Sequence, residues 1–167
     1  MSILKRETLF TRERQNQLDC DMSIKIRPSI EADLSSIYAL IKEFSIFQKT
    51  PEKVKITLEQ MIEDQNDFKC LVAVDKDKVI GFSSYYFAYH SWTGKVIYLD
   101  DLYVQSAYRG QNIGNQLFDA VMEIGKSNNC IKMKWLVSDW NTKAQEFYKS
   151  RGATIENTEW ICDLGFK

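Results

Sequence analysis

The amino-acid sequence predicts a mixed α/β (α+β) fold, and three features support this. Apolar residues recur at helical spacing in Ser29–Phe47 and again in Ile113–Ser127. Two β-rich runs, Cys70–Val74 and Val79–Ala88, are joined by a short polar turn, which is typical of a hairpin. A long run of β-branched and aromatic residues, Lys95–Val104, then leads through a polar loop into a helix. This order indicates a mixed sheet and not a plain doubly wound one.

The chain before the hairpin predicts one strand and two helices. Ile24–Arg27 alternates apolar and basic residues and stops at Pro28, as a short strand does. Thr57–Asp64 predicts a short helix. The longer helix, Ser29–Phe47, has its apolar residues on one face, and these are Leu34, Ile37, Tyr38, Leu40, Ile41 and Phe44.

The chain after the strand Lys95–Val104 predicts alternating helices and strands. The helix Ile113–Ser127 is followed by a strand at Ile131–Val137 and a helix at Thr142–Arg151, which ends before a glycine. We expect a final strand within Ile155–Asp163. The full predicted order is β-α-α-β-β-β-α-β-α-β.

Chain length and composition predict one domain. The 167 residues suit a single domain, and the two prolines and seven glycines do not suggest a flexible linker. Residues 1–21 mix both charge signs with few apolar positions, so we expect a flexible extension outside the core. Residues 22–167 then form the single folded domain.

Charge and cysteine content disfavour several classes of protein. A net charge of −1 gives no general affinity for nucleic acid or for an acidic membrane. The four cysteines form no CxxC pair and there is one histidine, so we predict no metal site and no Ser-His or Cys-His hydrolase. No apolar stretch reaches the roughly 18 residues of a membrane-spanning helix. We therefore expect a cytoplasmic protein whose thiols stay reduced.

The segment Tyr98–Gly114 carries the clearest sign of a binding site. A strand ends, a polar loop follows, and a helix begins near Ile113. The N-terminus of a helix presents unpaired N–H groups and the positive end of the helix dipole, which suits a phosphate. Gly110 and Gly114 let the backbone approach an anion closely, and Arg109 adds a permanent positive charge. Taken alone, this pattern is also compatible with an ordinary turn.

The loop resembles the pyrophosphate-binding motif of the GNAT acetyltransferases: Gln or Arg, two variable residues, Gly, one variable residue, then Gly or Ala. Arg109, Ile113 and Gly114 fit the motif, and Asn112 stands in place of its first glycine. Asn tolerates left-handed backbone better than most residues other than Gly, so we expect the loop to keep its shape with some loss of cofactor affinity.

A wider resemblance points to the diamine (spermidine/spermine) and thialysine N-acetyltransferases. It covers the chain from about Ile24 to Trp160 and is carried by short blocks in one order. The blocks are Ile26-Arg27-Pro28, Tyr85-Tyr86-Phe87, Trp92, Gly94-Lys95, Tyr98-Leu99-Asp100-Asp101, Tyr108-Arg109-Gly110, Asp139-Trp140-Asn141 and Phe147-Tyr148-Lys149.

This resemblance implies a GNAT fold, with a mixed, mostly antiparallel sheet flanked by helices, and acetyl-CoA as the co-substrate without a metal. In the family, the backbone of the central strand binds the pantetheine arm like an added strand. The matching positions here are Leu102, Tyr103 and Val104. The remaining cofactor positions are Arg109, Gly110, Gln111, Asn112, Ile113, Gly114, Asn115, Asn141, Lys143 and Ala144.

The resemblance also implies two catalytic residues. Asp100 matches an acidic position of the family, which binds the cationic amine and helps to remove its proton. Its neighbour Asp101 is expected on the opposite face of the strand. Tyr148 matches the general acid, which gives a proton to the departing thiolate. Asn141 is expected to cap the helix that carries Tyr148.

The substrate-binding positions that the resemblance implies are less typical of a polyamine enzyme. A Tyr-Glu pair of the diamine acetyltransferases is replaced by Phe47 and Gln48, which removes a carboxylate from the cation site. Glu43, one helical turn earlier, is a possible substitute. A second substrate-lining segment matches Lys134, Trp135 and Leu136. The resemblance therefore implies that the substrate is a small diamine, a polyamine or a thialysine-like amine. Asp100 is expected to be one of the residues that bind it.

Two alternatives stay open at the level of sequence. In the first alternative, the acetyl acceptor is a protein lysine or an N-terminal amine. In the second, the chain is a non-catalytic acetyl-CoA-binding module. The presence of both Asp100 and Tyr148 favours an enzyme, since a binding module needs neither. The family also implies a homodimer, with neither nucleic acid nor membrane as a partner.

Overall fold

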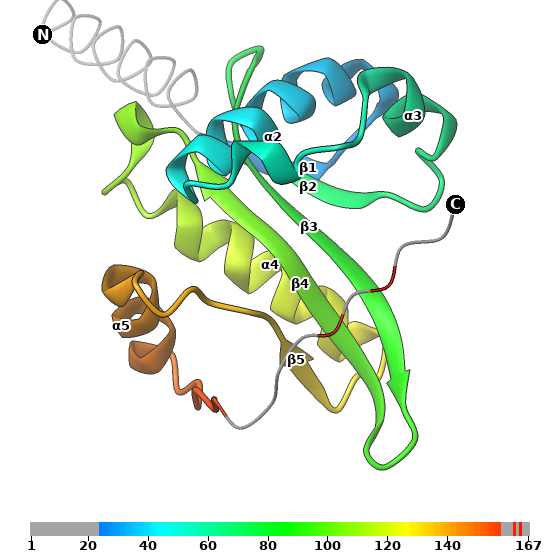
Figure 1. Ribbon diagram of the computed structural model, residues 1–167, viewed down its shortest axis with the longest axis vertical. Coiled ribbons are helices and arrows are strands. Elements are labelled where there is room, and N and C mark those ends of the chain that lie inside the picture. The colour runs from blue at the N-terminus through cyan, green and yellow to red at the C-terminus, as the bar shows by residue number, and fades with distance from the viewer. Residues whose placement is uncertain (1–23, 158–161, 163, 165–167) are drawn as a thin grey trace, which may run out of the picture. The chain divides into compact units, whose positions relative to one another are not determined.

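The computed structural model describes residues 24–157, 162 and 164 (Figure 1). The chain divides into two compact units, Met1–Lys134 and Trp135–Lys167. The predicted extension, residues 1–21, lies outside the described residues. None of the described helices is both long and apolar enough to cross a membrane.

The described part of the first unit contains a sheet and three α-helices. Its strands are β1 (Lys25–Pro28), β2 (Lys69–Asp75), β3 (Lys78–His90), β4 (Gly94–Val104) and β5 (Lys132–Lys134). Its helices are α2 (Leu34–Phe47), α3 (Leu58–Glu63) and α4 (Ile113–Ser127), with short 3-10 turns at η1 (Glu31–Asp33), η2 (Pro51–Lys53) and η3 (Ser106–Tyr108). The second unit contains α5 (Thr142–Ser150).

The strands pair in the order β1-β2-β3-β4-β5, so neighbours in sequence are neighbours in the sheet. The first three pairings are antiparallel and the last, between β4 and β5, is parallel. The predicted mixed, mostly antiparallel sheet is therefore confirmed. The predicted hairpin is β2–β3, which closes with the pair Asp75–Lys78.

Helices cover both faces of this sheet (Figure 1). On one face, α2 and α3 pack on alternate residues of β2, because successive strand residues point to opposite sides. This core consists of Leu34, Ile37, Leu40, Met61, Cys70, Val72, Val74, Val79, Phe82 and Tyr103. On the other face lies α4, whose buried residues include Ile113, Leu117, Phe118 and Val121.

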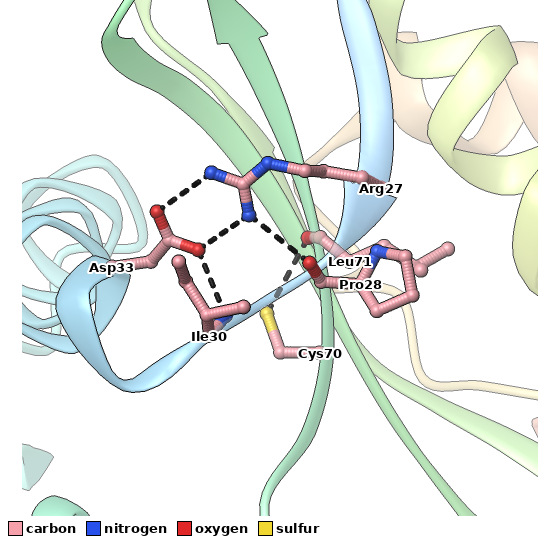
Figure 2. A network of polar contacts seen from close by, with 6 residues as sticks. All are labelled: Arg27, Pro28, Ile30, Asp33, Cys70 and Leu71. Carbon is pink, nitrogen blue, oxygen red and sulfur yellow. Dashed lines mark hydrogen bonds and ion pairs between the residues drawn. The ribbon is translucent and has the colours of Figure 1, made fainter.

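An ion pair fixes the start of α2 against β1 (Figure 2). The Arg27 guanidinium donates to both carboxylate oxygens of Asp33, at 2.6 and 3.0 Å, and the Ile30 N–H donates to the same carboxylate at 2.9 Å. Arg27 thereby holds the pKa of the buried Asp33 below its usual range. These bonds keep residues 31–33 in a separate 3-10 turn. The predicted helix Ser29–Phe47 therefore becomes α helical only at Leu34.

Two of the predicted strand ranges need correction. The strand expected at Ile131–Val137 ends at Lys134, and Trp135–Val137 are not in a strand. The parallel pairing stops at Tyr98, shortly before a β-bulge in β4, and bulges bend and twist the strand that carries them. The final strand expected within Ile155–Asp163 does not include residues 155–157, and most of the remainder lies outside the described residues.

The close approach of α4 to β4 depends on Gly125. A Cβ atom at this position would lie 2.6 Å from Cγ2 of the buried Ile97, whose β-branched side chain is stiff. Gly125→Ala is therefore expected to destabilise the protein by about 1–3 kcal/mol in urea unfolding, despite the better helix propensity of Ala. Gly114→Ala, in the same helix, is the matched control. Its Cβ meets nothing within 4 Å, so it should be neutral or stabilising.

Candidate functional site

A β-bulge places two carboxylates together in the middle of β4. On the β3 side, Ser84 stands between the pairs Ser83–Leu102 and Tyr85–Leu99, whereas β4 has both Asp100 and Asp101 in the same interval. The Asp101 N–H donates to Ser84 Oγ at 3.1 Å. The expectation that Asp101 faces away from Asp100 assumed unbroken alternation along the strand. The bulge interrupts that alternation, so the face on which Asp101 lies stays a prediction.

The two carboxyl groups have different environments. Burial, with a smaller contribution from the negative charge of Asp100, raises the pKa of Asp101 to about 7. Asp100 is exposed at the residue level, and partial burial of its carboxyl group raises its pKa as well. A carboxyl group that titrates near neutral pH suits proton transfer. The pair therefore offers both a carboxylate for a cation and a proton acceptor.

The raised pKa of Asp101 makes stability depend on pH. Because the folded protein holds this proton more tightly than the unfolded chain, the contribution favours folding at low pH. It is lost as the pH rises from the ordinary value, near 4, to about 7. The free energy of unfolding of Asp101→Asn, relative to that of the parent, is therefore expected to rise by about 1–3 kcal/mol from pH 5 to pH 8. Urea unfolding at both pH values measures this, with the exposed Asp77→Asn as the control. An equal effect of Asp101→Asn at both pH values would contradict the shift.

The loop between β4 and α4 has the backbone that an anion site needs. Gly110 has φ +79° and Asn112 has φ 64°, so both adopt the left-handed conformation. The prediction that Asn112 tolerates the place of a glycine is confirmed for the backbone. The Asn112 carboxamide accepts a bond from Asn115 Nδ2, which ties the loop to the first turn of α4. A Cβ at Gly110 or Gly114 would meet nothing within 4 Å, so the space next to the backbone is open.

The side chains of this loop differ in how accessible they are to a ligand. Ile113 is 1% exposed, so it can offer a ligand only its backbone. Gln111 is exposed. Arg109 Nε donates to the Val104 carbonyl oxygen at 2.9 Å, which gives that acceptor a partner within the protein. The open space, the two left-handed residues and the start of a long helix fit a pyrophosphate.

The C-terminal end of α2 lies next to the same loop. Phe47 is 39% exposed, and the Arg109 guanidinium lies 4.9 Å from the centre of its ring. Gln48 caps α2 through its backbone N–H, which donates to Phe44 O at 2.8 Å. The structure therefore brings one predicted substrate residue into contact with one predicted cofactor residue.

Lys134 ends β5, where it pairs with Tyr98 of β4. The same strand, β4, carries Tyr98 together with the predicted site residues Asp100, Leu102 and Tyr103. Trp135 and Leu136 belong to the second unit, and Leu136 is 65% exposed.

Tyr148 belongs to the second unit, where aromatic rings surround it. The Trp135 and Phe147 rings lie 4.9 and 5.1 Å from its own. Burial raises the Tyr148 pKa to about 12, so its hydroxyl group is protonated at neutral pH. Asn141 caps α5 as predicted, and its Oδ1 accepts the Ala144 N–H at 3.2 Å. The backbone donor of Ala144 is thereby used within the helix cap, and Lys143 lies in the first turn of α5.

The sequence analysis did not predict the environments of two residues. It places Asp101 on the face opposite to Asp100, because a bulge has no clear signature in a sequence of this kind. Glu43 was considered only as a substitute for a cation-binding carboxylate, yet both of its oxygens accept bonds from within the protein. Its position between the apolar Leu40 and Phe44 of α2 was the available signal, since a carboxylate there needs a partner.

The chemistry of the donor set does not point to a metal. Among residues 24–157, 162 and 164, no group of three or more His, Cys, Asp or Glu side chains is arranged to hold a metal ion.

Comparison with known proteins identifies the family of this chain. Residues 34–153 match the acetyltransferase (GNAT) family. A thialysine N-epsilon-acetyltransferase of Mus musculus is 37% identical over 153 residues, which cover 83% of this chain and 90% of the relative. A spermidine/spermine N(1)-acetyltransferase-like protein 1 of Homo sapiens is 35% identical over 87% of this chain and 22% of its own length.

Solved structures agree at the level of the fold. A crystal structure of an aminoglycoside acetyltransferase from an uncultured soil metagenomic sample, in complex with trehalose, matches with a TM-score of 0.71 and 22% identity. The match covers 86% of this chain and 97% of that one. The family match and the identity over most of the chain lead to one conclusion: this protein belongs to the GNAT family and is an N-acetyltransferase that acts on amines.

Proposed function

We propose that this N-acetyltransferase moves the acetyl group of acetyl-CoA directly to a primary amine of a small diamine, polyamine or thialysine-like compound. The observation that carries the proposal is the carboxyl pair Asp100 and Asp101 at the β4 bulge, on the strand that ends at the anion loop. The strand β4 thus carries the carboxyl pair, which suits a cationic amine, and leads into the loop, which suits the anionic pyrophosphate of acetyl-CoA. The names of the relatives in mouse and human support the same class of acceptor.

The proposed cofactor site is the end of β4, the loop and the start of α4. Arg109 and the backbone from Gly110 to Gly114 are proposed to bind the pyrophosphate, because the loop is open and left-handed at two positions. The backbone of Leu102 and Tyr103 is proposed to pair with the pantetheine amides, as an added strand would.

The transfer needs one proton acceptor and one proton donor. A primary amine near pH 7 is mostly protonated, so the carboxyl pair is proposed to bind the ammonium group and to take its proton. The neutral nitrogen then forms a bond to the acetyl carbonyl carbon as the carbon–sulfur bond breaks, and the nitrogen gives its second proton to solvent. Tyr148 is proposed to give its proton to the departing thiolate, which yields CoA and the N-acetyl amine. The proton left on the carboxyl pair returns Tyr148 to its starting state through solvent.

Charge near the proposed acceptor site favours a short amine over a long polycation. Gln48 is neutral, and Glu43 is occupied by bonds to Tyr103 and Gln105. Lys134 pairs with Tyr98 on the strand that carries Asp100, and its positive charge is proposed to oppose a second ammonium group and to suit the carboxylate of a lysine-like amino acid. We therefore propose that thialysine is a better acceptor than spermine.

A panel of acceptors tests the proposed function. CoA release from acetyl-CoA is measured with thialysine, lysine, putrescine, spermidine, spermine and a lysine-containing histone-tail peptide. We expect turnover with the small amines, with thialysine ahead of spermine in kcat/KM. Turnover with the peptide alone would replace the small amine by a protein acceptor. CoA binding without turnover on any amine would leave only a binding module.

We also propose a homodimer in the cytoplasm, formed by a single domain of residues 22–167. Tyr89 and Trp92, on the hairpin between β3 and β4, are 80% and 97% exposed, which is unusual for large aromatic residues and suits an interface. Cys70, Cys130 and Cys162 are free thiols, which suits a reducing compartment. Sedimentation equilibrium is expected to give the mass of a dimer, and the mass of a monomer at micromolar concentration would contradict this.

A further inference from the structure

A polar cluster joins α2 to the end of β4, away from the carboxyl pair. Tyr103 Oη donates to Glu43 Oε1 at 2.7 Å, and Gln105 Nε2 donates to Glu43 Oε2 at 3.1 Å. Both carboxylate oxygens of Glu43 therefore accept a bond from the segment that leads into the anion loop. Bonds that involve a charged acceptor are stronger and more directional than neutral ones.

The Tyr103 ring is held from two further sides. It packs against Phe44 of α2, with ring centres 5.2 Å apart. The Arg109 guanidinium lies 5.3 Å from the ring centre of Tyr103 and 4.9 Å from that of Phe47. A guanidinium stacks well on aromatic faces, so these two rings form a platform for Arg109.

The electrostatics fit this arrangement. Tyr103 is 4% exposed, and burial raises its pKa to about 12, with the bond to Glu43 acting in the same direction. Its hydroxyl group therefore keeps its proton and donates to Glu43 at neutral pH. If Glu43 were absent, a buried hydroxyl group would lose its partner, which favours movement of the ring towards another partner or water.

We propose that Glu43 is a positioning residue for acetyl-CoA. Glu43 fixes Tyr103 through the hydroxyl bond, Tyr103 and Phe47 fix the plane of Arg109, and Arg109 contacts the pyrophosphate. This inference rests on the proposed function, in which Arg109 belongs to the cofactor site. Both carboxylate oxygens of Glu43 are used by Tyr103 and Gln105, so its removal should weaken acetyl-CoA binding and leave the chemical step intact.

The test is a double-mutant cycle that uses Glu43→Gln, Tyr103→Phe and Arg109→Ala. Each of the first two variants removes one side of the bond and keeps the size of the side chain. We expect each to raise the Kd for CoA and the KM for acetyl-CoA about 3–10-fold, with kcat and the KM for the amine within about 2-fold. In the Arg109→Ala background, Glu43→Gln should change the Kd for CoA by less than about 2-fold.

Controls separate positioning from a general loss of structure. Glu63→Gln at an exposed position of α3 makes the same chemical change as Glu43→Gln, and Tyr38→Phe at a half-buried position of α2 makes the same change as Tyr103→Phe. Both should leave the Kd unchanged. A Kd for CoA in Glu43→Gln and Tyr103→Phe equal to that of the parent overturns the inference. So does an undiminished effect of Glu43→Gln in the Arg109→Ala background, since a merely structural role does not depend on Arg109. If Glu43→Gln does not fold, Tyr103→Phe alone decides.

Failure of the proposed function gives a different result. If calorimetric titration shows that the parent protein does not bind CoA, the proposed cofactor site is wrong, whatever the variants do. If the parent binds CoA and turns over amine while the variants match it, only the positioning role of Glu43 fails.

Discussion

Tyr148→Phe is expected to lower kcat about 100-fold or more, with the Kd for acetyl-CoA changed less than about 2-fold. The substitution removes one hydroxyl group and keeps the ring that packs against Trp135 and Phe147. The departing thiolate then lacks its proton donor, so the barrier to carbon–sulfur cleavage rises. The raised pKa of Tyr148 means that the parent carries this proton over the whole assay range.

The measurement is steady-state turnover together with calorimetric binding of CoA. Tyr38→Phe is the control, because Tyr38 lies half-buried on α2 and has no part in the proposed chemistry or in the proposed dimer interface. An unchanged kcat in Tyr148→Phe would remove Tyr148 as the acid. A large loss of CoA binding would show that the hydroxyl group acts on the donor in the ground state instead.

Asp100→Asn is expected to lower kcat/KM for the amine about 100-fold at pH 7, where almost all of the free amine is protonated. Asn keeps the size of the side chain but can neither hold the ammonium charge nor accept its proton. Asp101 remains in the bulge, yet burial raises its pKa to about 7, so at that pH it is ionised in only part of the molecules.

The defect of Asp100→Asn should shrink as the pH rises. An alkyl amine with a pKa near 10 supplies more of its own neutral form at pH 9.5 than at pH 7, so the need for a protein base falls. We expect the ratio of parent to variant in kcat/KM to drop about 10-fold over this range. Glu63→Gln serves as the control for the loss of a surface charge. A ratio that stays constant with pH would show that Asp100 binds the amine without removing its proton.

Most of the fold could be predicted from the sequence, because periodicity reports which face of each element is buried. The helix Ile113–Ser127 was predicted with its observed bounds, and the hairpin follows from two β-rich runs on either side of a polar turn. The C-terminal part of the chain was harder. An apolar run such as Ile131–Val137 predicts a strand from propensity alone, whereas the length of a parallel strand depends on the partner that it meets.

The site could be predicted where a residue acts through its own local backbone. Asn112 is an example, since its left-handed conformation follows from its replacement of a glycine next to a helix. The place of Asp101 in a bulge could not be predicted, because a bulge arises from the pairing of two strands and interrupts the alternation of side chains. The place of Glu43 between apolar residues of α2 indicates that it needs a partner, but its partners Tyr103 and Gln105 lie far along the chain and could not be predicted. Its role depends on tertiary structure alone.

Direct acetyl transfer is the central claim, and one experiment with labelled acetyl-CoA tests it. The enzyme is mixed with carbon-14 acetyl-CoA and thialysine, and CoA, N-acetyl thialysine and labelled protein are quantified over the first turnover. The account predicts equal amounts of CoA and N-acetyl thialysine, with no label on the protein when the amine is left out. CoA release without N-acetyl amine, or an acetyl group on the protein before the amine is added, would contradict it.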